Sequence, residues 1–187
     1  MENKYKFETY KNLLREWSKR MNLVAPSTLD DIDNRHFADS AQLASCLPVD
    51  AAVVDLGSGA GFPGVVLAIL GWRVTCIESI GKKVDFLTAV RDELHLDNLT
   101  IYHGRVENYI ASMGRGGKIV FTARAFAPLV RILDYMRGKK YELFLLKGAH
   151  VKEEINTAKR KYNFDFTLYP SKTGDGFIIN VKNYRPI

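Results

Sequence analysis

Short apolar runs alternate with longer helical patterns along residues 51–162, and few folds accommodate such an alternation. Five runs predict strands, at 51–56, 73–78, 99–102, 118–123 and 141–146. The stretches between them predict helices, at about 61–71, 80–95, 126–137 and 150–162. Strands that alternate with helices form a parallel sheet with helices on both faces. We therefore expect an α/β fold.

The C-terminal part of the chain departs from this alternation. Two strand-like segments, 164–169 and 176–181, follow one another with the turn-forming residues Pro170 and Gly174 between them. This pattern predicts an antiparallel hairpin. Added to the five parallel strands, the hairpin makes a mostly parallel sheet of seven strands.

The N-terminal part predicts two helices. Apolar residues recur every three or four positions in the first, which we expect to be closed by Pro26. Ser27 or Thr28 is expected to cap the second. We expect one domain over 1–187, consisting of a helical extension at 1–48 and a Rossmann-like core at 49–187.

Composition excludes several classes of protein. With 47% hydrophobic and 26% charged residues, the chain is neither disordered, collagen-like nor a disulfide mini-protein. Two isolated cysteines and an N-terminal segment without an apolar signal region predict a cytoplasmic protein. The longest charge-free stretch, 56–72, is shorter than the roughly 20 residues of a membrane span.

The loop after the first predicted strand has the sequence Asp55-Leu-Gly-Ser-Gly-Ala-Gly-Phe-Pro-Gly64. Glycines at a strand-to-helix turn let backbone N–H groups approach a ligand without a Cβ in the way. Two registers fit. The GxGxxG pattern, from Gly59 to Gly64, is typical of dinucleotide-binding loops. The DxGxGxG pattern, from Asp55 to Gly61, is typical of enzymes that use S-adenosylmethionine.

The charges of the two ligands separate these registers. A dinucleotide brings a pyrophosphate, which favours a bare helix N-terminus. S-adenosylmethionine brings a sulfonium and an amino group, which tolerate an acid at Asp55. Glu78, which ends the next predicted strand, suits either ligand because it can accept both ribose hydroxyls. Together with the terminal hairpin, this favours a methyltransferase, and a NAD(P)-dependent oxidoreductase stays as an alternative.

Seven motifs then occur in a characteristic order. They are Asn22-Leu23, Arg35-His-Phe-Ala-Asp-Ser40, the glycine loop, Glu78-Ser-Ile-Gly-Lys-Lys-Val-Asp-Phe-Leu87, Gly104-Arg-Val-Glu107, Ala123-Arg-Ala-Phe-Ala-Pro-Leu129 and Leu146-Lys-Gly148. This set, across residues 20–183, resembles the bacterial 16S rRNA guanine-N7 methyltransferases of the GidB (RsmG) family. The resemblance implies a Rossmann-like class I S-adenosylmethionine methyltransferase fold. It also implies S-adenosylmethionine as cofactor and the 16S rRNA of the small ribosomal subunit as substrate.

The resemblance also implies roles for individual residues. Together with the loop argument, it gives cofactor contacts at Gly57, Gly59, Phe62, Glu78, Val106, Glu107 and Arg124. Val106 and Glu107 would hold the adenine with an apolar wall and an acceptor for its amine. Arg124 would face the carboxylate of the cofactor or an RNA phosphate.

Four residues are candidate contacts to the RNA substrate, and each has a structural alternative. They are His36, Arg124, Phe126 and Lys147. Phe126 stacks on the guanine or lies in the core, and Lys147 meets RNA or is merely solvated. His36 lines the pocket mouth or is a satisfied core histidine. Guanine N7 has a free lone pair, so we expect the enzyme to act by aligning N7 with the methyl group rather than through a catalytic base. The histidine spacing predicts no metal site.

The charge distribution is consistent with an RNA partner. The 27 Lys and Arg residues exceed the 21 Asp and Glu residues, for a formal charge of +6. Residues 1–24 hold six basic and three acidic side chains, and residues 137–161 hold eight and three. Two basic segments suit contacts with phosphates on either side of a pocket. A noncatalytic RNA-binding domain stays as an alternative, and we expect a monomer.

Overall fold

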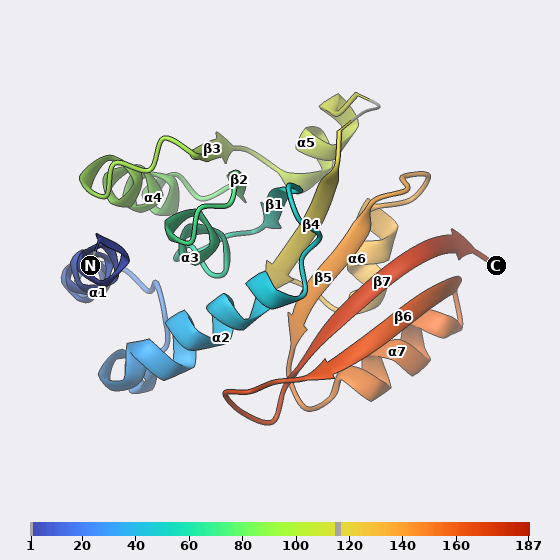
Figure 1. The fold of residues 1–187 in the computed structure, drawn as a ribbon. Helices are drawn as coiled ribbons and strands as arrows, with labels where there is room; N and C mark the ends of the chain where they lie inside the picture. Colours follow the sequence, from blue (N-terminus) through green and yellow to red (C-terminus); the bar gives the residue numbers. More distant parts are fainter. Residues whose placement is uncertain (1, 115–116) are drawn as a thin grey trace.

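A computed structural model describes residues 2–114 and 117–187, and its centre is one sheet of seven strands. The strands run in the order β3-β2-β1-β4-β5-β7-β6 (Figure 1). Their bounds are β1 Ala52–Leu56, β2 Val74–Glu78, β3 Leu99–His103, β4 Ile119–Arg124, β5 Glu142–Lys147, β6 Tyr162–Pro170 and β7 Phe177–Pro186. The first five are parallel, whereas β7 is antiparallel to both β5 and β6. The predicted α/β fold, mostly parallel sheet and terminal hairpin are confirmed.

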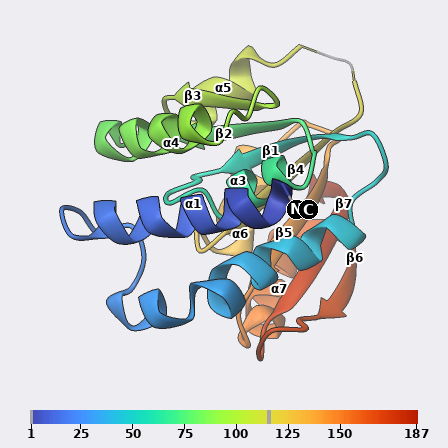
Figure 2. The ribbon, with the colours of Figure 1, turned by 60° about the vertical axis from the view of Figure 1, so that its left-hand side comes forward.

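Helices cover both faces of this sheet (Figure 2). Their bounds are α1 Glu2–Ser18, α2 Asp39–Ala41, α3 Gly64–Ile69, α4 Gly81–Glu93, α5 Val106–Ser112, α6 Leu129–Tyr135 and α7 Val151–Lys159. One apolar core joins α1, α3 and α4 to one face, and a second joins α5, α6 and α7 to the other. Successive residues of a strand point to opposite faces, so Val53 enters the first core and Val54 the second.

The N-terminal segment belongs to the first core rather than lying apart from it. Tyr10 and Leu14 of α1 are fully buried there. The Tyr10 hydroxyl donates a hydrogen bond to the carbonyl of Ala60, in the glycine loop. Lys11 forms an ion pair of 2.7 Å with Asp33. These contacts fix the N-terminal segment against the start of α3.

The predicted second N-terminal helix is present as a helical segment over 26–45, but the prediction of its cap was wrong. The segment begins at Pro26, its N-cap is Ala25, and neither Ser27 nor Thr28 caps it. Proline suits a first helical position, because it lacks the N–H that a cap would have to satisfy there. The segment is also irregular: 3-10 turns at Pro26–Asp31 and Gln42–Ser45 flank a π-helical stretch at Asp33–Ala38 and the short α2.

Other predicted boundaries also differ from the structure. The first helix ends at Ser18, well before Pro26. The hairpin strands are longer than predicted, because β6 begins at Tyr162 and pairs with a β7 that continues to Pro186. Helix α5, which begins at Val106, was missed because seven residues give too short an apolar repeat. In the described part of the chain, no helix is long and apolar enough to span a membrane.

Candidate cofactor site and an adjoining cavity

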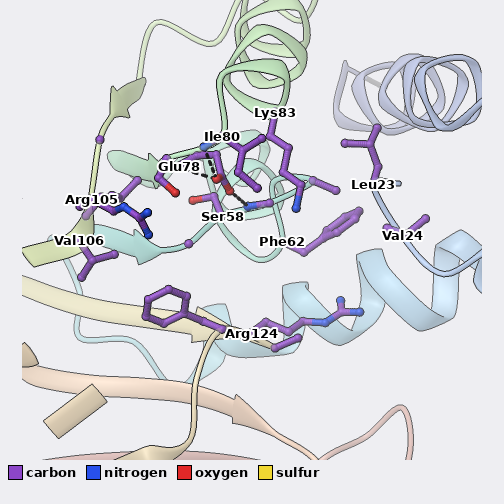
Figure 3. Close-up of a pocket in the computed structure, with 18 of the residues that line it drawn as sticks. Leu23, Val24, Ser58, Phe62, Glu78, Ile80, Lys83, Arg105, Val106 and Arg124 are labelled. Carbon is purple, nitrogen blue, oxygen red and sulfur yellow. Dashed lines mark hydrogen bonds between the residues drawn. The ribbon is translucent and has the colours of Figure 1, made fainter. Parts of the chain in front are cut away.

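A cavity of about 580 Å³ opens at the carboxyl ends of β1, β2 and β4 (Figure 3). The strand order reverses between β1 and β4, which is where open α/β sheets bind ligands. Figure 3 shows Glu78, Arg105 and Val106 on one side of the cavity and Leu23, Val24 and Phe62 on the other. A volume of this size holds a nucleoside-sized ligand.

The glycine loop forms the floor of this cavity. Gly57 has a φ of +65°, in the left-handed region that favours glycine. A Cβ placed on Gly57 would lie 2.2 Å from Cδ2 of Phe126, so the aromatic ring packs directly against the glycine. The loop therefore needs glycine at this position for both backbone conformation and space.

Asp55 lies beneath the loop and does not line the cavity. Its side chain is fully buried, and Oδ2 accepts a hydrogen bond of 3.1 Å from the Gly64 amide. Burial raises the pKa of this carboxyl from 3.8 to about 7. Within the described residues, Oδ1 has no hydrogen-bond partner. Asp55 thus supports the turn into α3 instead of contacting a ligand.

Glu78 presents a fixed carboxylate to the cavity. Its Oε2 accepts a bond of 2.9 Å from the Gly59 amide, and Oε1 accepts bonds of 2.8 and 2.9 Å from the amides of Ser79 and Ile80 (Figure 3). Three backbone donors therefore hold the group without using all of its acceptor sites. This arrangement suits recognition of vicinal hydroxyls such as those of a ribose.

The third wall comes from the loop after β3. Val106 and Glu107 begin α5, and both line the cavity, as does Arg105. Val106 is 5% exposed and offers an apolar surface, whereas Glu107 is exposed. An apolar wall beside an acceptor is the pair that the resemblance assigns to adenine.

Arg124 and His36 form a hydrogen-bonded chain across the cavity. Nη2 of Arg124 lies 2.6 Å from Nδ1 of His36, and Nε2 of His36 lies 2.8 Å from Oγ1 of Thr28. The Thr28 hydroxyl itself donates to the Ala25 carbonyl, at 2.7 Å. Since Arg124 can only donate and the Thr28 hydrogen is already used, His36 is neutral and carries its proton on Nε2.

Burial and the nearby Arg124 guanidinium agree with this assignment, because they lower the pKa of His36 to about 4. The imidazole is 5% exposed and stacks on Phe62 with centroids 4.8 Å apart. His36 is therefore a satisfied, buried histidine that also lines the cavity, which combines both predicted alternatives.

A second cavity of about 650 Å³ adjoins the first, at the carboxyl ends of β4 and β5. Arg124, Ala125 and Phe126 line both cavities. Ala125 has a φ of +50°, an uncommon conformation for a non-glycine residue, and such strain clusters at functional sites. We call these three residues the shared wall.

Lys147 lines the second cavity but is not a free cation. Its ammonium donates to the carbonyl of Ala127 at 2.7 Å and to the Glu154 carboxylate at 2.8 Å. The side chain is 9% exposed. The same Glu154 oxygen accepts a bond from the Leu129 amide, so the three groups tie β5 to α6 and α7.

The structure brings the seven predicted cofactor residues together around the first cavity. These are Gly57, Gly59, Phe62, Glu78, Val106, Glu107 and Arg124. Of the substrate candidates, Arg124 and Phe126 lie on the shared wall, His36 in the first cavity and Lys147 in the second. The sequence argument missed Leu23, Val24 and Lys83 as lining residues, although each lies within or next to one of the quoted motifs.

The cavity fits S-adenosylmethionine. A Cβ on Gly59 would meet no atom nearer than 3.9 Å, so the loop is open to a ligand there, and Glu78 supplies a fixed acceptor. The described residues contain no group of three or more His, Cys, Asp or Glu side chains that would bind a metal ion.

Comparison with known proteins agrees with this assignment. The GidB family model, described as rRNA small subunit methyltransferase G, matches residues 3–173. The chain is 40% identical over 178 residues to the ribosomal RNA small subunit methyltransferase G of Dinoroseobacter shibae, covering 90% of this chain and 89% of that protein. It is 37% identical to the protein of the same name from Rhizobium leguminosarum bv. trifolii, covering 98% and 94%.

Solved structures show the same fold at low identity. A variant of MtNAS in complex with S-adenosylmethionine superposes with a TM-score of 0.61 at 15% identity, over 96% of this chain and 75% of that chain. An rRNA methylase from Streptococcus thermophilus superposes with a TM-score of 0.50 at 15% identity, over 76% of this chain and 92% of that chain. The family match favours the DxGxGxG register over a dinucleotide-binding loop. The chain therefore belongs to the GidB family, rRNA small subunit methyltransferase G, and is a methyltransferase that uses S-adenosylmethionine.

Proposed function

We propose that this protein methylates N7 of one guanine in the 16S rRNA of the small ribosomal subunit. The observation that carries the proposal is the pair of adjoining cavities at one edge of the sheet, in a chain of this family. The first cavity has the glycine floor and fixed carboxylate suited to the cofactor. The second opens from the same wall and accepts the base.

Residues of the first cavity position the cofactor in this proposal. Glu78 accepts the ribose hydroxyls, and Val106 with Glu107 holds the adenine. When bound, S-adenosylmethionine supplies an electrophilic methyl group on a sulfonium centre. The backbone around Gly57 and Gly59 lets it sit close to the shared wall.

The proposed reaction needs orientation rather than a general base. Guanine N7 carries a lone pair and has no proton to lose, so alignment lowers the barrier. His36 is hydrogen-bonded to Arg124 of the shared wall, and it is unsuited to take a proton. Its Nδ1 already accepts from Arg124, and its Nε2 donates to Thr28. In this proposal Phe126, which lines the second cavity, stacks on the base, and Arg124 donates to an acceptor beside N7.

The surroundings support an RNA partner. Lys83 and Arg105 line the first cavity, and Arg35 lines the second, so each cavity has cationic side chains in its lining. Lys147 was predicted to meet RNA or to be solvated, but its ammonium already bonds to Glu154, so we propose a structural role for it. Phosphate contacts would make binding weaken steeply with salt. We further propose that the enzyme acts as a monomer in the cytoplasm, without a metal ion.

Methyl transfer from labelled S-adenosylmethionine to 16S RNA tests this function. The RNA is offered naked, in free small subunits and in whole ribosomes, and the product is treated with borohydride and aniline, which cleave RNA at 7-methylguanosine. We expect one cleavage site in at least one of these substrates. Transfer without cleavage would argue against N7, and no transfer to any of them would overturn the proposal. Calorimetry with NAD gives the control, for which we expect no binding.

A further inference from the structure

The second cavity contains a carboxylate that the proposed reaction does not use, that of Asp39. Its Oδ1 accepts bonds from Nε2 of Gln42 at 2.9 Å and from the Thr173 hydroxyl at 3.0 Å. Its Oδ2 lies 3.4 Å from Nη1 of Arg124, too far for a good hydrogen bond. One oxygen is therefore fixed by neighbours, and the other keeps acceptor capacity at the cavity wall.

Arg124 provides the complementary group. Its Nη2 donates to His36, but Nη1 is buried, and no residue in 2–114 or 117–187 offers it an acceptor in hydrogen-bonding geometry. An unsatisfied buried guanidinium N–H is costly, and it is a group that a ligand can satisfy. Because Arg124 belongs to the shared wall, that ligand would lie where the two cavities meet.

Guanine has the matching pattern. Its N7 and O6 are adjacent acceptors, whereas N1 and N2 carry donors on the neighbouring Watson–Crick edge, beyond O6. With N7 turned toward the first cavity, O6 lies beside the shared wall and the two donors point into the second cavity. The protein offers the matching groups in the same order: Nη1 of Arg124 is a donor at the shared wall, and the Asp39 carboxylate is an acceptor in the second cavity.

On the basis of the proposed function, we infer that Asp39 is the residue that selects guanine. Asp39 accepts hydrogen bonds from N1–H and N2–H of the base, while Nη1 of Arg124 donates to O6. Adenine fits poorly, because it presents an amine to Arg124 and a lone pair to Asp39. Phe126 packs against the glycine loop beside this position and provides an apolar surface for the base.

Two positioning residues hold the carboxylate in place. Gln42 donates to Asp39 and also accepts a bond of 2.9 Å from the amide of Lys172, in the turn of the hairpin. Thr173 lies in that same turn. The hairpin turn and the N-terminal segment thus meet at Asp39, which explains why a carboxylate at the mouth of the cavity has a defined position.

The test uses 16S RNA with either guanosine or inosine at the methylated position, in the substrate form that wild-type enzyme accepts. Inosine keeps N7, O6 and N1–H but lacks the N2 amine. We expect wild-type enzyme to lose about 10–100-fold in kcat/KM on inosine, the effect of a hydrogen bond to a charged group. Asp39→Asn should lose a similar factor on guanosine and then discriminate between the two RNAs by less than about threefold.

Matched controls separate recognition from folding. Calorimetry with S-adenosylmethionine should give similar affinity for Asp39→Asn and wild type, since Asp39 does not line the first cavity. Thr173→Val removes one bond to the carboxylate but keeps the carboxylate, so it should lose activity and retain discrimination.

Three outcomes would overturn the inference. The first is equal kcat/KM of wild-type enzyme on the guanosine and inosine RNAs. The second is a ratio of these two kcat/KM values in Asp39→Asn that is unchanged from wild type. The third is a loss of this ratio in Thr173→Val that is as complete as in Asp39→Asn. The first needs no variant, so it applies even if Asp39→Asn fails to fold. Wild-type enzyme that methylates neither RNA would overturn the proposed function, and this inference with it.

Discussion

The two cavities on either side of the shared wall are built in different ways. The first is lined largely by short contiguous segments, 57–60, 77–80 and 104–107, and its carboxylate is held by backbone amides. The second joins segments more than 100 residues apart through side-chain bonds, such as that of Thr173 to Asp39. Cofactor binding therefore depends on local backbone conformation, and base recognition depends on tertiary contacts.

Gly57→Ala is expected to have the largest effect, because it alters the backbone floor of the first cavity. A left-handed φ costs an alanine about 1 kcal/mol, and overpacking against Phe126 adds about 2 kcal/mol. The loop must shift to relieve this contact. We expect the affinity for S-adenosylmethionine to fall by about 100-fold, as measured by calorimetry.

Gly59→Ala is the control for this prediction. Gly59 has a similar φ of +57°, but a Cβ there meets only the carbonyl oxygen of Gly57, at 3.9 Å. Its cost to the stability of the free protein should be limited to the backbone term, about 1 kcal/mol, as measured by urea unfolding. Equal losses of stability in the two variants would show that contact with Phe126 is unimportant.

The difference between the two cavities also explains which parts of the site the sequence could predict. The glycine loop, Glu78 and the Val106–Glu107 pair are local signals that follow strands, so their meeting point follows from the parallel sheet. The register of Thr173 against Asp39 depends on how the hairpin turn meets an irregular helical segment. No local pattern encodes that contact.

Glu78→Gln tests the fixed carboxylate of the first cavity. Three backbone amides donate to Glu78, and a glutamine turns its own N–H groups toward at least one of them. We expect a loss of about 2 kcal/mol, or roughly 30-fold in cofactor affinity. Glu107→Gln keeps an acceptor on an exposed side chain, so calorimetry should show a change below about threefold. A larger loss for Glu107→Gln would reverse this ranking.

Two buried titratable groups beside the first cavity, Asp55 and His36, should give pH dependences of opposite sign. The pKa of Asp55 is raised from 3.8 to about 7, so the folded state binds its proton more tightly and stability falls as pH rises from 4 to 7. The pKa of His36 is lowered from 6.5 to about 4, so stability falls as pH drops through the same range. Each contributes at most about 1.4 kcal/mol per pH unit.

Urea unfolding between pH 4.5 and 7.5 separates these contributions. Relative to wild type, Asp55→Asn should make stability rise more steeply with pH. His36→Gln should make it fall more steeply. Curves parallel to wild type for both variants would contradict the buried pKa values.

The sequence identified the acid at Asp55 but did not determine whether it faces the ligand or the turn. An acid at Asp55 was expected to be tolerable or useful beside the sulfonium and amino group of the cofactor, whereas the structure buries it under the loop, where it accepts a bond from the Gly64 amide. A sequence pattern indicates that an acid is needed at the end of a strand. Whether it faces the ligand or the turn depends on side-chain packing that the pattern does not contain.

Lys147→Met should have the smallest effect, and it tests whether the second cavity uses this lysine for structure or for RNA. The ammonium already bonds to Ala127 and Glu154, so we expect a loss of about 1 kcal/mol in urea unfolding. We expect no change in the salt dependence of RNA binding, because a charge neutralised by Glu154 releases no counterion from a phosphate. Lys152→Met, at an exposed lysine of α7, is the matched control for charge. If Lys147→Met lowered the salt slope by about one unit and Lys152→Met did not, Lys147 would be an RNA contact that exchanges Glu154 for a phosphate.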